Sequence, residues 1–308
     1  MRTVINTPGD IAPTRFGEVE EPKPEAAEAL VAIRAFSVNR GELALLKSRP
    51  EGWRPGQDIA GVVVEPAADG SGPSSGSRVV GLVEGAGWSQ FAAVPTERLA
   101  VLPDSVSMEQ AATLPIAGLT ALRTLRTGGN LLGRRVLITG ANGAVGRFQI
   151  ELAARSAAQV TAVTTRAEEV RRQLQELGAE EVVPDIEVAS GLFDLIQESV
   201  GGTALTGAIK KIAPGGTIVV LGSSSGEAGR VSVYDFIGHE GARIQNYMSY
   251  ASTDPVDRDL QVLADLVGEG RLRPTIGFSD CWSELNTAIE LLGDRKLSGG
   301  KAVLSIPD

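Results

Sequence analysis

The stretch VLITGANGAVG at residues 136–146 decides the fold of this chain. The apolar run VLIT (136–139) is followed by three spaced glycines, Gly140, Gly143 and Gly146. The segment AVGRFQIELAAR (144–155), which contains the last of them, has apolar residues at helical spacing. The strict pattern G-x-G-x-x-G is absent, because Asn142 stands where the middle glycine would fall. The pattern G-x-x-G-x-x-G still permits a tight turn at the first glycine, a close approach of backbone and pyrophosphate at the second, and close helix packing at the third.

A helix that begins directly after this loop would point free N–H groups and a partial positive charge at a phosphate. We therefore expect the loop to bind a dinucleotide through Gly140, Asn142, Gly143, Ala144, Val145 and Gly146. The alternative is a plain glycine-rich turn between a strand and a helix. The strand–helix units that follow along the chain favour the binding interpretation.

Downstream of the loop, strand and helix patterns alternate. Strands are expected in QVTAVTT (159–165), EEVVP (180–184), FDLIQESVGG (193–202), GTIVVLGSS (216–224) and RIQNYMSY (243–250). The helix AEEVRRQLQELG (167–178) ends at Gly178, which is placed as a C-cap. Strands buried on both faces and linked by helices predict a doubly wound parallel sheet of the Rossmann type. Helices near 256–268 and 283–292 and a last strand at 301–306 follow.

The first part of the chain has a different texture. Short strand patterns at 28–36, 58–66, 77–83 and 89–95 are separated by turns rich in glycine, proline and serine. This spacing predicts a β-rich domain. Ser107 and Gln110 have the spacing of a capping box, so a helix should begin there.

Length and charge limit the class of protein. At about 100–200 residues per domain, 308 residues predict about two domains. The formal net charge is −9, and so acidic a chain repels nucleic-acid phosphates and anionic lipid. No apolar run approaches the ~20 residues that span a bilayer, and the N-terminus has no signal-peptide core. We therefore expect a cytoplasmic protein without nucleic-acid or membrane partners.

Two residue counts argue for an organic cofactor. His239 and Cys281 are the one histidine and the one cysteine, whereas a zinc site takes three or four ligands that are mostly of these types. No G-x-S-x-G elbow accompanies the histidine. We expect no metal, no disulfide and structural roles for both residues.

The end of the second strand of the parallel sheet indicates which nucleotide binds. It reads Thr164, Thr165 and Arg166, with no carboxylate before Glu168. A carboxylate there would repel a 2′-phosphate, whereas two hydroxyls and a guanidinium can bind one. The stretch predicts NADPH. The alternative is that Arg166 is a solvated charge at a helix start.

A run of motifs in one order resembles a known family. The motifs include AFSVNRGEL (35–43), GQDIAGVV (56–63), residues 87–122, APGGTIVVLGSSSG (213–226) and LSGGKAVL (297–304), besides the glycine loop. The chain resembles the medium-chain dehydrogenase/reductase superfamily, in its zinc-free quinone oxidoreductase branch. The resemblance implies a GroES-like β-rich domain of residues 1–117 and 260–308, a Rossmann domain of residues 118–259, and a homodimer formed through the strand at 243–250.

The resemblance also implies a nicotinamide site in a cleft between the domains. Asn39 and Thr120 would lie near the nicotinamide, Ser199, Val200, Leu221, Gly222 and Ser223 would line the strand ends, and Asn246, Tyr247, Met248 and Lys301 would close the site. The expected reaction is hydride transfer to a quinone or to the β-carbon of an α,β-unsaturated carbonyl compound. Hydrogen-bond donors must then stabilise the enolate oxygen. The candidates are Asn39, Arg40 and Thr120, and water can supply the proton.

Departures from the family pattern keep alternatives open. Zinc-dependent relatives carry a cysteine near 39–42 and a His-Glu pair where Gln57 and Asp58 stand here. No tyrosine precedes Tyr234, so the proton-donating tyrosine of enoyl thioester reductases is absent. Pro184 and Asp185 stand where many NADPH-dependent relatives have a tyrosine. Asn39 as a turn residue, Arg40 as a surface charge, an enone reductase of a polyketide-like pathway, and a non-catalytic NADPH-binding sensor remain alternatives.

Overall fold

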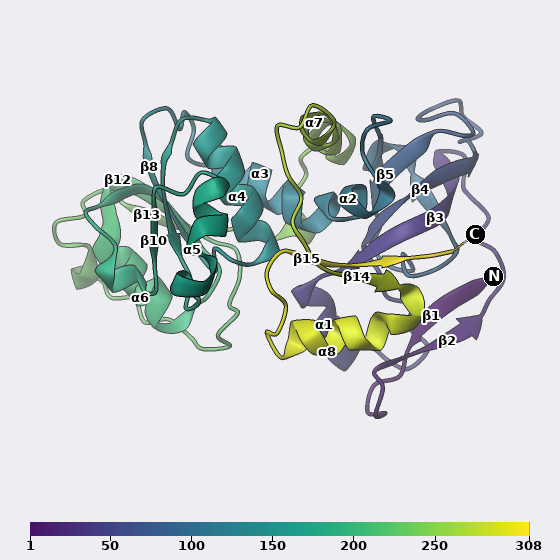
Figure 1. Ribbon diagram of the computed structural model, residues 1–308, viewed down its shortest axis with the longest axis horizontal. Helices are drawn as coiled ribbons and strands as arrows, with labels where there is room; N and C mark the ends of the chain where they lie inside the picture. The colour runs from purple at the N-terminus through teal and green to yellow at the C-terminus, as the bar shows by residue number, and fades with distance from the viewer. Residues whose placement is uncertain (308) are drawn as a thin grey trace. The chain divides into compact units, whose positions relative to one another are not determined.

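The computed structural model describes residues 1–307, which form two compact units (Figure 1). Met1–Leu119 and the chain from Thr253 onward make the first unit, and Thr120–Ser252 make the second. The family resemblance implies divisions after residues 117 and 259. The first division falls two residues later in the structure and the second seven residues earlier.

The second unit contains a parallel sheet of six strands, ordered β10-β9-β8-β11-β12-β13. The strands are β8 (Arg135–Thr139), β9 (Gln159–Val163), β10 (Glu181–Val183), β11 (Phe193–Glu198), β12 (Ile212–Val220) and β13 (Arg243–Asn246). The helices are α3 (Leu119–Arg126, whose first residue belongs to the first unit), α4 (Ala144–Arg155), α5 (Ala167–Glu176) and α6 (Gly202–Lys211). This confirms the predicted doubly wound parallel sheet.

The strand order reverses between β8 and β11, and the reversal determines where the helices lie. From β8 the chain moves outward through α4 to β9 and through α5 to β10, and then returns to β11 on the other side of β8. Since such crossovers are right-handed, α4 and α5 cover one face of the sheet and α6 the other. The strands are accordingly apolar on both faces. A switch point of this kind is where ligands of open α/β sheets bind.

Helix α6 corrects the sequence reading, which continued the strand through residue 202. The strand β11 ends at Glu198, because Gly201 and Gly202 adopt φ values of +80° and +54° that a strand does not permit. Backbone rotation at these glycines turns the chain into the helix. The strand predicted at 243–250 is likewise shorter and ends at Asn246.

The first unit is built on a seven-stranded sheet that is antiparallel except at one edge, with the order β14-β15-β3-β4-β5-β7 and β6 paired to β3. Its strands are β3 (Glu28–Val38), β4 (Asp58–Glu65), β5 (Arg78–Leu82), β6 (Phe91–Pro95), β7 (Leu99–Val101), β14 (Ile276–Cys281) and β15 (Lys301–Ser305). A hairpin of β1 (Arg2–Asn6) and β2 (Thr14–Glu18), which the sequence did not predict, completes the strands. The last strand thus returns to the first unit, where it pairs with β3.

Helices of the first unit flank this sheet. They are α1 (Arg40–Ser48), α2 (Met108–Ala112), a π-helical turn η2 (Leu114–Gly118), α7 (Val256–Gly268) and α8 (Leu285–Gly293). Short 3-10 turns are η1 (Thr96–Arg98), η3 (Ile186–Val188), η4 (Val233–Phe236), η5 (Ser249–Ala251) and η6 (Trp282–Glu284), of which η3 to η5 belong to the second unit. The capping box predicted at Ser107 is confirmed. The Ser107 hydroxyl accepts from the Gln110 amide at 3.2 Å, and the Gln110 side chain accepts from the Ser107 amide at 3.0 Å.

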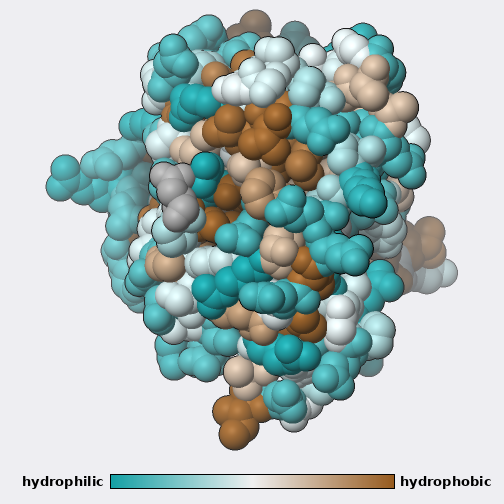
Figure 2. Space-filling view, turned by 90° about the vertical axis from the view of Figure 1, so that its right-hand side faces the viewer, coloured by the Kyte–Doolittle hydropathy of each residue, from teal (hydrophilic) through white to brown (hydrophobic). Residues whose placement is uncertain are grey.

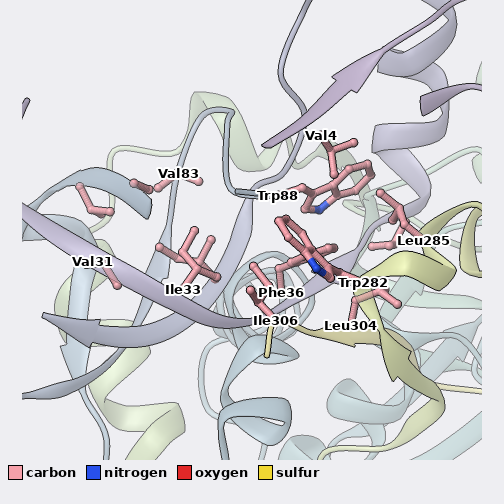
Figure 3. Close-up of a cluster of buried hydrophobic side chains, with 14 of the residues drawn as sticks. Val4, Val31, Ile33, Phe36, Val83, Trp88, Trp282, Leu285, Leu304 and Ile306 are labelled. Carbon is pink, nitrogen blue, oxygen red and sulfur yellow. The ribbon is translucent and has the colours of Figure 1, made fainter. Parts of the chain in front are cut away.

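The core of the first unit joins residues from both ends of the chain, as Figure 3 shows. Phe36 on β3 stacks on Trp88 with ring centroids 5.7 Å apart, and Trp282, Leu304 and Ile306 come from the C-terminal segment. Trp88 is fully buried in this core. Its indole therefore packs the β-rich unit.

Large apolar side chains are exposed in both units, for example Ile11 in the first and Tyr234 in the second. On the face of the first unit shown in Figure 2, hydrophobic residues form small groups among hydrophilic ones. No helix within residues 1–307 combines the length and the apolar character needed to cross a bilayer.

Candidate functional site

The carboxyl ends of β8, β11 and β12 meet at one edge of the parallel sheet, and three turn residues crowd together there. Gly140 follows β8 with a φ of +60°, and a Cβ at this position would lie 2.5 Å from the Ser199 hydroxyl oxygen. Ser199 donates from its backbone N–H to the Thr139 hydroxyl at 2.9 Å. A Cβ on Gly222 would lie 3.0 Å from the Ser199 carbonyl. Both glycines are therefore required by the closeness of the three strand ends.

The loop that follows β8 leaves bare backbone at the start of α4. Gly143 is the N-cap of α4, is exposed, and has an ordinary φ of −73°. Only the Gly140 carbonyl, at 3.2 Å, lies near a Cβ placed on Gly143. At Gly146, by contrast, a Cβ would lie 2.7 Å from the Ala141 Cα. Gly146 thus serves helix packing, whereas the exposed backbone at Gly143 is available to a dinucleotide phosphate at the helix N-terminus.

A buried carboxylate that the sequence reading missed holds the neighbouring turn. Glu198 is fully buried at the end of β11, and its Oε1 accepts from the backbone N–H groups of Val200 at 2.8 Å and Gly201 at 3.1 Å. The Thr139 hydroxyl donates to the same oxygen at 3.1 Å. The signal in the sequence was an acidic residue at the end of the apolar run FDLIQE.

The remaining predicted cofactor residues of the second unit lie along the same edge. Asn246 pairs in register with Val220, and the Tyr247 amide donates to the Val220 carbonyl at 2.9 Å. The Leu221 amide donates to the Glu198 carbonyl at 2.9 Å. The edge therefore brings together Gly140, Asn142, Gly143, Ala144, Val145, Gly146, Thr164, Thr165, Arg166, Ser199, Val200, Leu221, Gly222, Ser223, Asn246, Tyr247 and Met248.

The end of β9 is tied to the glycine loop. The Ala141 amide donates to the Val163 carbonyl at 3.1 Å, and Thr164 follows, almost buried. Arg166 is the N-cap of α5, and its guanidinium pairs with Glu169 at 2.8 Å. Arg147 on α4, a second arginine that the sequence reading did not single out, donates to Asn142 of the loop at 2.6 Å and to Gln173 of α5 at 2.8 Å.

The first unit holds a separate buried polar cluster, formed by Ser37, Asn39, Asp58 and Lys301. Oδ2 of Asp58 accepts from the Lys301 ammonium at 2.8 Å, the Asn39 amide nitrogen at 2.9 Å and the Ser37 hydroxyl at 2.7 Å. The ammonium also donates to the Asn39 side-chain oxygen at 2.6 Å. None of these side chains belongs to a residue that is more than 8 % exposed. Asp58 is thus a member of this cluster. In the sequence, Asp58 stands out only because it departs from the zinc-binding pattern of relatives.

A further carboxyl group lies beside this cluster. Glu42 is fully buried in the first turn of α1, and its Oε2 accepts from the Asn39 backbone N–H at 2.7 Å. Burial and the neighbouring Asp58 charge raise the pKa of Glu42 to about 8, against weaker opposing effects of Asn39 and Lys301. At neutral pH the Glu42 side chain is therefore mainly protonated.

Two of the predicted catalytic residues lie outside this cluster. Arg40 donates from Nη2 to the Leu292 carbonyl at 3.2 Å, and partial burial and the Arg295 charge lower the pKa of Arg40. Thr120 belongs to the second unit, where its carbonyl accepts from the Thr124 hydroxyl at 2.7 Å. That Asn39, Arg40, Thr120 and Lys301 share a nicotinamide site with the sheet edge stays a prediction.

One unit is a Rossmann sheet whose edge could bind a nucleotide, and the other is a β-rich unit with a buried polar cluster. This pair of units is typical of a two-domain dehydrogenase or reductase. A family model described as zinc-binding dehydrogenase matches residues 177–304. The chain is 30 % identical over 285 residues to the mouse mitochondrial NAD(P)H oxidoreductase RTN4IP1, a match that covers 82 % of this chain and 70 % of the relative. The chain therefore belongs to the medium-chain dehydrogenase/reductase superfamily, in its quinone oxidoreductase-like branch.

Other relatives differ in length. A quinone oxidoreductase-like protein 2 homolog of Nematostella vectensis is 28 % identical over 305 residues, covering 91 % of this chain and 82 % of the relative. A mycocerosic acid synthase-like polyketide synthase of Mycobacterium tuberculosis is 31 % identical over 241 residues, covering 72 % of this chain. The match spans only 11 % of that synthase.

Solved structures share the fold. The quinone oxidoreductase of Coxiella burnetii superposes with a TM-score of 0.85 at 23 % identity, covering 100 % of this chain and 99 % of the other. The CurK enoyl reductase superposes with a TM-score of 0.86 at 20 % identity, covering 99 % of each chain.

The polar cluster does not fit the zinc ion that the family model's description implies. Zinc takes cysteine, histidine and carboxylate ligands, whereas the Asn39 amide and the Asp58 carboxylate here bind the Lys301 ammonium. Within residues 1–307 no group of three or more His, Cys, Asp or Glu side chains could hold a metal ion.

Proposed function

We propose that this protein is an NADPH-dependent, metal-independent reductase that acts on a quinone or an α,β-unsaturated carbonyl compound. The observation that carries the proposal is the edge at which Gly140, Ser199 and Gly222 crowd together beside the bare backbone of Gly143. The names of the relatives support it, since they include an NAD(P)H oxidoreductase and a quinone oxidoreductase-like protein.

The residues of the edge would hold the cofactor in a fixed orientation. The backbone N–H groups at the start of α4 would bind the diphosphate, because they are free of helix partners. Thr164, Thr165 and Arg166 would bind the 2′-phosphate, and the turn held by Glu198 would fix Ser199 and Val200 below the cofactor. A bound nicotinamide would supply the hydride that reduces the electron-poor carbon of the substrate.

The chain's remaining task would be to stabilise the negative oxygen that forms on the substrate. Donors already held in place do this without reorganisation. Asn39, Arg40 and Thr120 are the proposed donors, with the Lys301 charge supporting Asn39 through the 2.6 Å hydrogen bond. Water would protonate the enolate carbon, so no side chain has to act as the acid. Metal independence is supported by the Lys301 ammonium, which binds the oxygen atoms that a cation would need.

A second candidate is an enoyl reductase dedicated to a polyketide-like pathway. It is favoured by the match to a polyketide synthase and by the structural likeness to an enoyl reductase. Under this alternative the acceptor is an enoyl thioester. The two candidates share the cofactor and differ in the acceptor.

We also propose that two copies of the chain associate through β13 of the second unit. This strand lies at the sheet edge with only β12 beside it, so its outer N–H and C=O groups face away from the sheet. Large apolar side chains are exposed on β13 and on the segments that precede and follow it in the sequence. They belong to Val231, Val233, Tyr234, Ile237, Ile244, Met248 and Tyr250. We expect Ile244→Lys to convert a dimer into a monomer in sedimentation experiments, and a wild-type monomer would refute this.

With a net charge of −9, neither nucleic acid nor an anionic membrane is a proposed partner.

The activity is tested by following NADPH absorbance with a panel of quinones, enones and enoyl thioesters. Oxidation with quinones or enones supports the leading proposal, and oxidation with thioesters alone supports the second candidate. Tight NADPH binding with no acceptor consumed would indicate a non-catalytic binding protein. Absence of binding would refute the cofactor site itself.

The variant Gly143→Val tests where the phosphates bind. Because Gly143 is exposed, has an ordinary φ, and would bring a Cβ close only to the Gly140 carbonyl oxygen, at 3.2 Å, we expect at most a small fall in the melting temperature. Nucleotide binding should be lost, since the side chain blocks approach to the backbone. Unchanged affinity would refute this placement.

A further inference from the structure

Arg147, in the first turn of α4, is a buried cation whose hydrogen-bond acceptors within residues 1–307 are all uncharged groups. The residue is 6 % exposed. Its Nη2 donates to Asn142 Oδ1 at 2.6 Å and to Gln173 Oε1 at 2.8 Å, and its Nε donates to the Asn142 carbonyl oxygen and to Oδ1, both at 3.2 Å. Every one of these acceptors is neutral. A guanidinium stays charged in a protein, so its burial costs free energy that neutral partners repay only in part.

The surroundings of Arg147 add further positive potential. The charge of Arg166, after burial itself, lowers the pKa of Arg147, so the two guanidinium groups lie close enough to repel. The positive end of the α4 dipole lies in the same place, because the helix begins at Ala144. The charge of Arg166 is paired with Glu169, whose side chain is 62 % exposed. Water and salt weaken an exposed pair of that kind.

Three positive features therefore converge beside the ends of β8 and β9, and an anion would relieve their mutual repulsion. The hydrogen bonds from Arg147 to Asn142 and Gln173 hold its guanidinium in one orientation between the glycine loop and α5. A planar, pre-oriented guanidinium is the group best suited to a phosphate.

We infer that Arg147 is a specificity-determining residue that acts together with Arg166 on the 2′-phosphate of the adenosine ribose, and so selects NADP(H) over NAD(H). The inference rests on the proposed function for the presence of a nicotinamide dinucleotide. It goes beyond that proposal in assigning the selection of the phosphorylated form to a buried helix residue as well as to the residues after β9. An NAD(H) molecule would leave the repulsion between the two arginines uncompensated.

The test measures binding of NADPH, NADH, 2′,5′-ADP and 5′-AMP to the whole chain by calorimetry. Two variants remove the available charge in different ways. Arg147→Gln deletes the guanidinium, and Gln173→Glu leaves Arg147 in place but gives Nη2 a carboxylate in place of a neutral acceptor. Arg172→Gln is the matched control, because it removes the same charge from a side chain on α5 that is 92 % exposed and paired with Glu176.

We expect both variants to weaken NADPH and 2′,5′-ADP by about 10- to 150-fold, the loss expected for a hydrogen bond to a charged group. NADH and 5′-AMP should change by less than about threefold, and the Arg172→Gln control should change none of the four. The stabilisation of the wild type by 2′,5′-ADP in thermal unfolding should fall in both variants.

Equal losses for NADPH and NADH would overturn the inference, because Arg147 would then serve the loop or the diphosphate. Unchanged NADPH affinity would also overturn it. If Arg147→Gln shows no cooperative unfolding, the Gln173→Glu result decides. A wild type that binds neither dinucleotide would refute the proposed function itself, whereas a wild type that binds NADPH alongside variants without selective loss refutes only this inference.

Discussion

Replacing Glu42 by glutamine should make the first unit more stable, and the gain should grow with pH. Burial and the Asp58 charge raise the pKa of Glu42 to about 8 from an ordinary value of 4.5. Between these pH values the folded chain keeps a proton that the unfolded chain releases, so stability falls as pH rises. Glutamine has the shape of the protonated acid, and its side-chain oxygen can still accept from the Asn39 amide.

The size of the effect follows from the same two values. Each pH unit between 4.5 and 8 costs the wild type about 1.4 kcal/mol, which amounts to about 3 kcal/mol at pH 7. For a domain of this size the variant should therefore melt about 6–12 °C higher at pH 7. The difference should vanish below pH 4.5, where Glu42 is protonated in both states, and level off above pH 8.

The assay is thermal unfolding of both proteins from pH 5 to pH 9, followed by circular dichroism. Glu51→Gln is the matched control, because it makes the same change at an exposed turn residue of the same unit. Its curve should run parallel to that of the wild type. If the Glu42→Gln curve also runs parallel, Glu42 is not a buried neutral acid and the electrostatic account of the polar cluster is wrong.

Three further predictions concern the two sites. Asp58→Asn and Lys301→Met should each lower the melting temperature by about 6–20 °C, because either change leaves a buried charge without its partner. The double variant should lose less than the sum of the two single losses, and strictly additive losses would contradict the pairing. Gly146→Ala should destabilise the second unit by about 1–3 kcal/mol, since its Cβ would lie 2.7 Å from the Ala141 Cα, and a melting temperature equal to that of the wild type would contradict this. Arg166→Ala should weaken NADPH at least about tenfold more than NADH in fluorescence titrations, and equal losses would exclude its role at the 2′-phosphate.

Local sequence patterns were enough to find most of the parallel sheet. The run 136–146 contains an apolar strand, a glycine turn and a helix start, and the helix predicted at 144–155 has those bounds in the structure. The patterns failed where backbone conformation depends on neighbours. Gly201 and Gly202 end β11 with positive φ values, and the edge strand β13 stops after four residues, which periodicity alone could not indicate.

The candidate site divides in the same manner. The glycines of the loop could be read from the sequence, because their spacing between an apolar run and a helix start is a local pattern. Glu198, Asp58 and Arg147 could not, because their importance comes from distant partners. The carboxylate of Asp58 meets an ammonium 243 residues away, and the guanidinium of Arg147 meets Gln173 and the charge of Arg166 only after α4 and α5 pack together.

The sequence by itself thus determined the fold class and the place of the glycine loop, because hydrophobic period and glycine spacing act over a few residues. Only the tertiary structure decided which charged side chains are buried, since burial removes water from a group and depends on every element that packs around it. That removal keeps a proton on Glu42 and leaves Arg147 as a cation among neutral partners.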